Sequence, residues 1–207
     1  MNLLHKFFAQ TRKPEGFLGK VMVGGMNGGH AKLADWGMQF LPPKVPENVL
    51  EIGCGGGRNA GELLKRFPAS YVTAIDYSPV SVDKAAAYNK EMIAAGRCSV
   101  RAGNASDLPF SDGTFQLATA FETVYFWPGL IKCFSEVCRV LKPGGVFLIC
   151  NESDGTDETA LKYEKIIDGM KCYTVDDLKA ALLAAGFSEV ESKHHTEKPW
   201  ITVIARK

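Results

Sequence analysis

The sequence predicts an α/β fold in which a doubly wound, mostly parallel sheet carries helices on both faces. Two observations support this prediction. From Pro46 onward, short apolar runs alternate with helical stretches that are long enough to connect two parallel strands. After Gly186, two runs of alternating apolar and polar residues replace that rhythm, which is typical of an antiparallel pair at one edge of a sheet.

The first 44 residues differ in character from the rest and predict a helical cap. An amphipathic pattern indicates a short helix around residues 3–8, and a glycine-rich segment follows at residues 22–30. A second helix is predicted from His30 to Leu41, because Pro42-Pro43 cannot continue it. We expect this cap (1–44) and the core (45–207) to form a single domain.

The elements of the core are predicted from the period of their apolar residues. Strands are expected at 49–52, 71–75, 98–101, 117–121 and 145–150, helices at 58–66, 79–95, 129–141 and 174–185, and the closing pair at 188–192 and 200–204. Ser78 is a predicted N-cap in front of Pro79, and Gly186 is a predicted C-cap.

Composition limits the classes of function. With 207 residues, 46% of them hydrophobic, the chain can bury a sizeable core. A net charge of +1 without a block of like charges argues against a nucleic-acid partner. No apolar stretch approaches the roughly 20 residues of a membrane span, so we expect a cytoplasmic protein without stable membrane insertion. The six cysteines form no Cys-x-x-Cys pair, so no metal site is predicted, and nothing indicates the oligomeric state.

The most informative segment is the turn after the first apolar run. Residues 49–57, Val-Leu-Glu-Ile-Gly-Cys-Gly-Gly-Gly, place Glu51 near the end of that run and four glycines close behind it. Glycine lets the backbone approach a ligand where a Cβ atom would clash, and the following helix offers free N–H groups there. Asp76 ends the next apolar run, where a carboxylate suits the two hydroxyls of a ribose. The pattern predicts a nucleoside site.

Two further sequence segments are informative, in addition to the glycine turn at 49–57 and the strand end at 72–79 that carries Asp76. They are residues 101–115, which include Leu-Pro-Phe at 108–110, and residues 139–145, which end in Lys-Pro-Gly-Gly. In this order the four segments resemble the class I S-adenosylmethionine (SAM) dependent methyltransferases, especially the small-molecule branch related to ubiquinone and menaquinone biosynthesis enzymes. The resemblance covers roughly residues 45–150. It implies a three-layer, Rossmann-like fold with seven mostly parallel strands and an antiparallel closing hairpin.

The resemblance also implies contacts to SAM and to its product S-adenosylhomocysteine (SAH). Glu51 would organise the site near the methionine amino group, Asp76 would bind the ribose hydroxyls, and Tyr77 would flank the adenine. The methionyl and ribose moieties would be lined by Gly53, Cys54, Gly55 and Gly57. Asn104 and Ala105 stand beside the adenine, where the family usually has Asp-Ala, and the carbonyl oxygen of Asn104 can accept from the adenine amino group.

The segment from Glu122 to Trp127 would lie beneath the transferable methyl group. Tyr125 is expected to face the site, whereas Phe126 and Trp127 are interpreted as core residues because large aromatic side chains mostly bury area.

Three other segments are expected near the acceptor. In the cap, the spacing of His30, Leu33 and Trp36 or Gly37 gives one helix face that would close over the ligand. The insert at 152–171, with Tyr163, would form another wall, and His194-His195 are interpreted as solvated surface.

The sequence therefore predicts an enzyme that transfers a methyl group from SAM to a nucleophilic atom of a small-molecule acceptor. The sulfonium of SAM is already activated, so the protein mainly has to align the reactants and exclude water. For a neutral acceptor, Glu122, His30 and Tyr125 are the candidates to take up the proton, in that order. Two alternatives stay open. Residues 55–60 also satisfy a relaxed dinucleotide fingerprint, as in an NAD(P)-dependent oxidoreductase, and a noncatalytic SAM- or SAH-binding module would carry the same turn.

Overall fold

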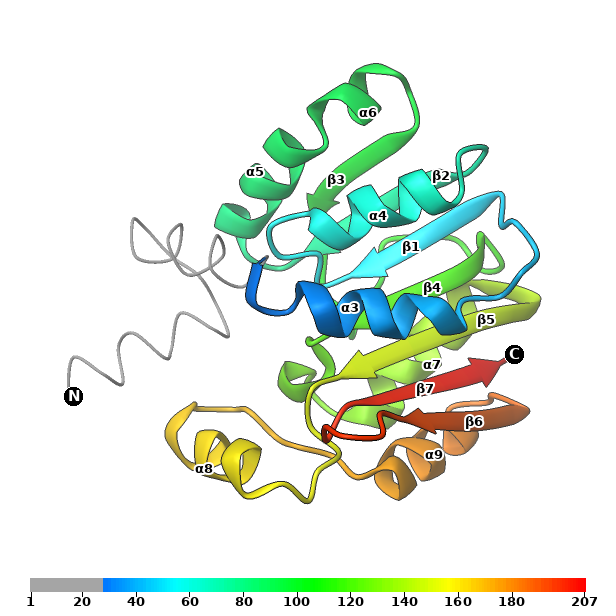
Figure 1. Cartoon of the computed structure of the whole chain (residues 1–207). Helices are drawn as coiled ribbons and strands as arrows, with labels where there is room; N and C mark the ends of the chain where they lie inside the picture. Colours follow the sequence, from blue (N-terminus) through cyan, green and yellow to red (C-terminus); the bar gives the residue numbers. More distant parts are fainter. Residues whose placement is uncertain (1–27) are drawn as a thin grey trace.

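The computed structural model describes residues 28–207, and a seven-stranded sheet runs through their centre (Figure 1). The strands are β1 (Asn48–Ile52), β2 (Tyr71–Asp76), β3 (Cys98–Ala102), β4 (Phe115–Phe121), β5 (Leu141–Asn151), β6 (Glu189–His194) and β7 (Ile201–Arg206), in the order β3-β2-β1-β4-β5-β7-β6. Strands β1 to β5 pair in parallel, and β7 lies antiparallel between β5 and β6. The predicted sheet and its closing hairpin are confirmed.

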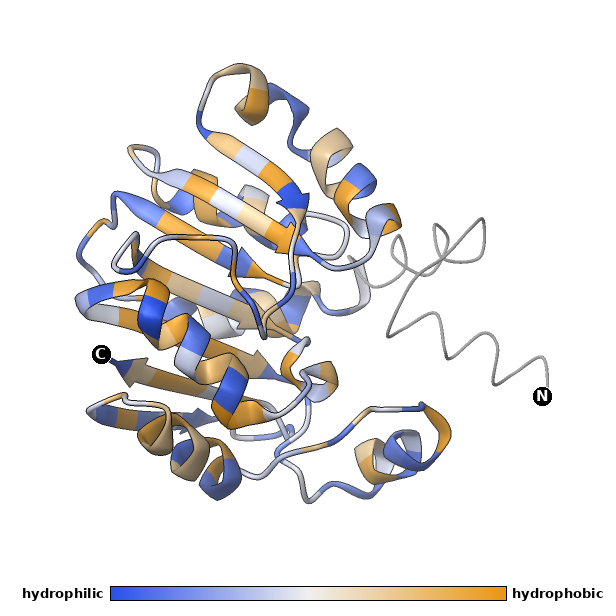
Figure 2. Cartoon of the chain, turned by 180° about the vertical axis from the view of Figure 1, so that it is seen from behind, coloured by the Kyte–Doolittle hydropathy of each residue, from blue (hydrophilic) through white to orange (hydrophobic). Residues whose placement is uncertain are grey.

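Helices cover both faces of this sheet, which gives three layers (Figures 1 and 2). One face carries α3 (Ala31–Gly37), α4 (Arg58–Arg66) and α5 (Pro79–Tyr88), with α6 (Lys90–Ala94) after α5, and the other carries α7 (Leu130–Val140) and α9 (Val175–Ala184). Strand β4 serves both layers, because Leu117 and Phe121 pack toward α3 and α4 while Ala118 and Ala120 pack toward α7. Each side of the sheet therefore has its own apolar core.

Local sequence explains where several helices begin and end. The Ser78 side chain accepts from the Ser81 N–H at 3.4 Å, with Pro79 at the first helical position, as predicted. Thr174 forms a reciprocal capping box with Asp177, and Gly186 follows α9 with a φ of 102°.

The helix predicted at 79–95 is wrong in one respect, because it breaks at Asn89 into α5 and α6. The Asn89 side chain donates to the Gly57 carbonyl at 2.9 Å and to the Ala85 carbonyl at 3.0 Å. The break thus ties α5 to the glycine turn. The second cap helix is also shorter than predicted, since α3 ends at Gly37 and one 3₁₀ turn (Met38–Phe40) leads to Pro42-Pro43.

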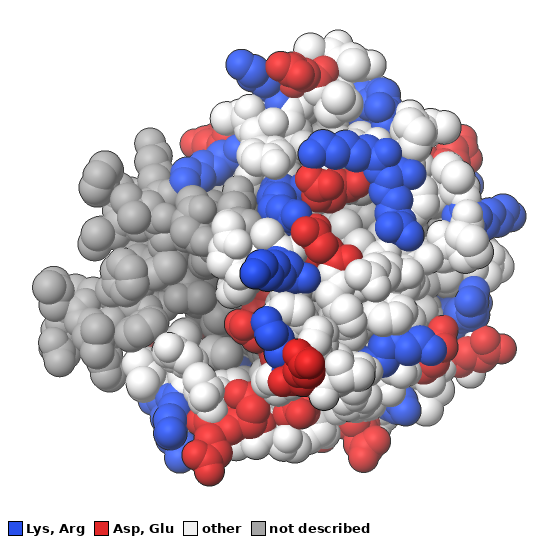
Figure 3. Space-filling view, in the orientation of Figure 1, with Lys and Arg blue, Asp and Glu red and all other residues white. Residues whose placement is uncertain are grey.

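Two further observations concern the surface and the cap. Positive and negative side chains are interspersed over the face shown in Figure 3, in keeping with the net charge of +1. Within residues 28–207, none of the helices has the length and apolarity needed to cross a membrane. Two predicted parts of the cap lie outside the described residues: the helix around residues 3–8 and the glycine-rich segment as far as Asn27.

Candidate active site

A cavity of about 240 Å³ opens at the carboxyl ends of β1, β2 and β4. In a doubly wound sheet this edge is where ligands bind, because neighbouring crossovers leave to opposite faces and open a crevice. One half of the lining comes from the glycine turn, Asp76-Tyr77 and residues 103–105, and the other half comes from α3 and from residues 121–128. The cavity therefore joins both groups of predicted site residues.

The glycine turn approaches this cavity as predicted, with one exception. Gly53, Cys54 and Gly55 line it, and φ is 76° at Gly53 and 50° at Gly55, values that favour glycine. Gly57 does not line it, which corrects the prediction. A Cβ atom at Gly57 would lie 2.6 Å from the Ala85 Cα, so this glycine allows α4 to pack closely on α5. Gly56, Arg58 and Asn59 line the cavity without having been predicted.

Asp76 is held at the tip of β2 by the backbone around it. Its Oδ2 accepts from the Gly55 N–H and its Oδ1 from the Ser78 N–H, both at 2.9 Å. Burial raises the pKa of Asp76, and these hydrogen bonds oppose that rise. The Ser81 side chain and the Tyr77 backbone also hydrogen-bond to this carboxylate, so a ribose hydroxyl would share an oxygen with one of these donors or replace it. Tyr77 also lines the cavity and is 43% exposed, which leaves its ring accessible to a ligand.

Asn104 and Ala105 lie in the lining, where the resemblance placed them. The Asn104 Oδ1, however, accepts from both the Ser106 N–H and the Ser106 hydroxyl, each at 3.0 Å. Since a carbonyl oxygen has two lone pairs, the predicted hydrogen bond from an adenine amino group requires Ser106 to move.

Glu51, which was predicted to organise the site near the methionine amino group, does not itself line the cavity. The residue is fully buried between β1 and β4, where the Thr119 hydroxyl donates to Oε2. Its Oε1 has no hydrogen-bond partner within the described part of the chain. Burial raises the pKa of Glu51 to about 8, and the Thr119 hydrogen bond opposes the rise. Glu51 is therefore mostly a neutral carboxylic acid at pH 7.

Glu122 projects into the acceptor half of the cavity from the end of β4. Its φ is 58°, and it is the one residue other than glycine with a positive φ among residues 28–207. Its Oε1 accepts from the Tyr125 hydroxyl at 3.1 Å and from the Glu152 N–H. Burial raises the pKa of Glu122 to about 8, assisted by the nearby charge of Glu152.

Two of the three aromatic residues that follow lie where they were not expected. Trp127 is buried in the core, as predicted, where it stacks on Phe147, and it also reaches the cavity lining; Phe126 was interpreted as core and lines the cavity. Tyr125 does not line the cavity. It is buried behind Glu122, where its hydroxyl accepts from the Ser153 N–H at 3.0 Å. The 3₁₀ turn at Val124–Phe126 explains the exchange, because it rotates Tyr125 toward the interior.

His30 stands at the start of α3, on the same side as Glu122. Its Nε2 lies 3.9 Å from the Glu122 Oε2 and 3.8 Å from the Glu152 Oε2. Burial lowers the pKa of His30, and the charge of Glu152 opposes this effect. Leu33 and Ala34 of the same helix complete this wall. The structure thus brings together the predicted pair and Glu152, a residue that the sequence indicated merely as the start of an insert.

The expected wall from the insert, and Trp36 of the predicted cap face, lie elsewhere. Residues 152–171, with α8 (Glu158–Ile166), do not line the cavity, and Tyr163 is 40% exposed. Trp36 packs against Phe40, Trp200 and His195 instead of closing over the ligand. His195 is therefore partly covered by aromatic rings, which corrects its interpretation as solvated surface, whereas His194 is exposed.

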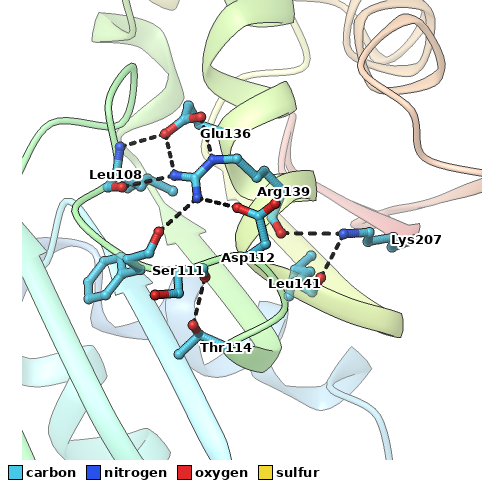
Figure 4. A network of polar contacts seen from close by, with 9 residues as sticks. Leu108, Ser111, Asp112, Thr114, Glu136, Arg139, Leu141 and Lys207 are labelled. Atoms are coloured by element: carbon cyan, nitrogen blue, oxygen red, sulfur yellow. Dashed lines mark hydrogen bonds and ion pairs between the residues drawn. The ribbon is translucent and has the colours of Figure 1, made fainter.

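Arg139 holds the loop that follows Asn104 and Ala105, the residues predicted to lie beside the adenine (Figure 4). Arg139 on α7 donates to the Leu108 and Phe110 carbonyls at 3.0 and 2.7 Å, and to the carboxylates of Asp112 and Glu136 at 2.8 Å. Glu136 in turn accepts from the Leu108 N–H at 2.8 Å. The loop between β3 and β4 is thereby fixed to α7, and Asn104 and Ala105 stand at its beginning.

Comparison with known proteins shows what this chain is similar to. Residues 49–145 match the family model described as a methyltransferase domain. The chain is 29% identical over 158 residues to a sterol 24-C-methyltransferase of Gibberella zeae, which covers 72% of this chain and 40% of the relative. It is 31% identical to the corresponding enzyme of Saccharomyces cerevisiae, with 73% and 43% coverage. The chain thus spans less than half of the length of these relatives.

Solved structures show the same fold. A methyltransferase from a complex with the Trm112 activator of Haloferax volcanii superposes with a TM-score of 0.80 at 19% identity, covering 90% of this chain and 93% of that one. A SAM-dependent methyltransferase of Aquifex aeolicus gives a TM-score of 0.71 at 18% identity, with 90% and 97% coverage.

Proposed function

We propose, from the premise that the chain belongs to the class I SAM-dependent methyltransferases, that it transfers a methyl group from SAM to a small-molecule acceptor and releases SAH. The observation that carries this proposal is the single cavity that joins two chemically different halves. The glycine turn, Asp76 and Asn104 suit an adenosine, and His30, Glu122, Phe126 and Trp127 face the place of the acceptor.

Alignment supplies most of the catalysis in this site. When bound, SAM contributes a methyl group that is already activated by a positively charged sulfur. The protein holds the cofactor by the carboxyl ends of β1 and β2 and the acceptor by the ends of β4 and α3. Phe126 and Trp127 line the cavity, where aromatic rings would exclude water and could attract the sulfonium of bound SAM by about 0.5–2 kcal/mol.

Of the three predicted catalytic residues, Glu122 and His30 line the cavity, which supports the proposal that they contact the acceptor. Tyr125 would act through Glu122, because its hydroxyl donates to the Glu122 carboxylate behind the cavity wall. We expect alanine at position 122 or 30 to lower turnover while SAM affinity is kept. Phenylalanine at position 125 should have a smaller effect in the same direction.

The chemical identity of the methyl acceptor is a proposal that rests on the relatives. Sterols and O-methylated compounds are the acceptors that the names of several relatives indicate, but the chain spans about half of those proteins or less. Membership in the branch of ubiquinone and menaquinone biosynthesis enzymes is supported by the four sequence segments alone. The cytoplasmic location and the organisation as one domain stay predictions.

Transfer of a labelled methyl group tests this function. The protein is incubated with [methyl-³H]SAM and a fractionated metabolite extract, and label in a low-molecular-weight product together with SAH supports the proposal. Calorimetry with SAM, SAH and NADH separates the alternatives. Binding of NADH without SAM would favour the oxidoreductase, and SAM binding without transfer to any fraction would favour the noncatalytic module.

A further inference from the structure

We propose that His30, Glu122 and Glu152 form a binding site for a divalent transition-metal cation on the acceptor side of the cavity. The binding of the ion is independent of the proposed methyl transfer, but the use suggested for it below rests on that function.

The geometry of the three side chains carries this inference. They come from three separate places, the start of α3, the end of β4 and the end of β5, and one donor atom from each lies within 4.8 Å of the others. Metal ligands at about 2.0–2.2 Å from an ion stand roughly 3–3.5 Å from one another. The His30 Nε2 is 3.9 and 3.8 Å from the two carboxylate oxygens, and those two oxygens lie within 4.8 Å of each other, so small side-chain rotations would bring the three donor atoms to ligand spacing.

The surroundings hold Glu122 in the orientation that a ligand needs. Its Oε1 accepts from the Tyr125 hydroxyl and from the Glu152 N–H, which turns its Oε2 toward His30. Hydrogen bonds of this kind commonly fix metal ligands. The positive φ of Glu122 costs about 1–2 kcal/mol, and such strain is concentrated where a side chain must be placed for function.

The electrostatics at this point favour a cation. Two carboxylates face one imidazole, and no Lys or Arg within residues 28–207 forms an ion pair with either of them. Arg58, the one Lys or Arg in the described cavity lining, is the first residue of α4 and pairs with Asp35 at 2.6 Å. A divalent ion between these side chains would offset the negative charge of both carboxylates.

The donor set indicates the kind of ion and of acceptor. One imidazole with two carboxylates suits Mn²⁺, Fe²⁺ or Zn²⁺ better than Mg²⁺, which prefers oxygen alone. Three protein ligands leave positions open toward the cavity. We infer an acceptor that offers a hydroxyl oxygen to the ion. The hydroxyl proton leaves to solvent, the oxygen forms a bond to the methyl carbon, and the carbon–sulfur bond breaks with its electrons going to sulfur.

Titration of the metal-stripped full chain with Mn²⁺ tests the site without any substrate. Loss of the free-ion EPR signal should show a single equivalent bound, and calorimetry with Zn²⁺ should agree. His30→Ala and Glu152→Gln should each weaken binding by about tenfold or more. Glu158→Gln, on the exposed part of α8, is the matched control and should bind normally. Absence of stoichiometric binding, or equal affinity in all variants, would overturn the proposal.

A second measurement excludes the competing occupant and checks folding. SAM carries a positive sulfur and an ammonium group, and either could be what the carboxylates attract. SAM affinity in chelator should therefore be unchanged in His30→Ala and Glu152→Gln, which also shows that the variants fold. A parallel loss of SAM affinity would assign the carboxylates to the cofactor and refute the metal site. Failure of methyl transfer with intact metal binding would instead count against the proposed function.

Discussion

Replacement of Glu51 by glutamine should make the stability of the protein less dependent on pH. Glu51 is fully buried, its Oε1 has no partner within the described residues, and burial raises its pKa from 4.5 to about 8. Glutamine has nearly the same shape and can accept from Thr119 in the same way. It carries no charge at any pH, so the comparison isolates the titration of this carboxyl group.

The sign and size of the effect follow from linkage. Because the folded state holds the proton more tightly than the unfolded state, the contribution of Glu51 to stability is full below pH 4.5 and is lost as pH rises toward 8. One pKa unit corresponds to about 1.4 kcal/mol, so between pH 5 and pH 8 the unfolding free energy should fall by about 3–4 kcal/mol more in the wild type than in Glu51→Gln. At pH 5 the two proteins should differ by about 1 kcal/mol or less.

Urea unfolding followed by circular dichroism at pH 5, 6, 7 and 8 measures this difference. Glu47→Gln, an exposed carboxyl in front of the same strand, is the matched control and should keep the wild-type slope. Calorimetry should find the SAM affinity of Glu51→Gln within about threefold of the wild type, because the side chain does not line the cavity. Parallel pH profiles for wild type and Glu51→Gln would refute the assignment of a raised pKa, and a large loss of SAM affinity would return Glu51 to the cofactor site.

Three further substitutions probe the cofactor half and its support. Asp76→Asn should lower SAM affinity in calorimetry by about tenfold or more, because hydrogen bonds to a charged group are lost, whereas the exposed Asp83→Asn should not. Gly53→Ala should lower the unfolding free energy by about 3 kcal/mol or more, since its Cβ would overlap the Thr123 side chain, and Gly55→Ala, with open space at its Cβ, by about 1–2 kcal/mol; equal losses would contradict the overlap. Arg139→Lys should lower the unfolding free energy by about 2 kcal/mol through lost contacts to the 108–112 loop, against less than about 0.5 kcal/mol for Arg206→Lys, whose contact to Glu189 is a single exposed pair; similar values would show that the loop does not need the arginine.

Most of the fold could be predicted because each element carries a local signal. Apolar period, the proline after Ser78 and the glycine after α9 define the strands and helices without knowledge of distant contacts. The break at Asn89 had no such signal. Its cause is a tertiary contact, the hydrogen bond to the Gly57 carbonyl, and a contact between segments far apart in the chain cannot be read from the period of either one.

The two halves of the site also differ in how well their residues could be predicted from local sequence. Gly53, Gly55 and Asp76 were predictable because backbone approach and ribose recognition require particular residue types at strand ends. Tyr125 and Phe126 were assigned to the wrong sides, because a 3₁₀ turn after β4 decides which ring faces inward and its sequence has no strong marker. The burial of Glu51 could not be read from the glycine turn, because it depends on the contact with Thr119 of β4, a residue far away in the sequence.

In the acceptor half of the site, a parallel sheet brings together side chains whose proximity could not be predicted from the sequence. Glu122 and Glu152 follow β4 and β5, and the carboxyl ends of these strands lie at one edge because the strands are adjacent and parallel. His30 comes from α3, which precedes β1 in the sequence, and its side chain reaches the same two carboxylates. Each of the three side chains is unremarkable in its own segment. Their proposed role depends on their lying close together in space. A substitution at any one of them therefore changes the electrostatic environment of the other two. Acceptor selection in this protein should therefore respond to His30, Glu122 and Glu152 as a unit, with nonadditive effects in double variants, and additive effects would indicate that the three do not share one ligand.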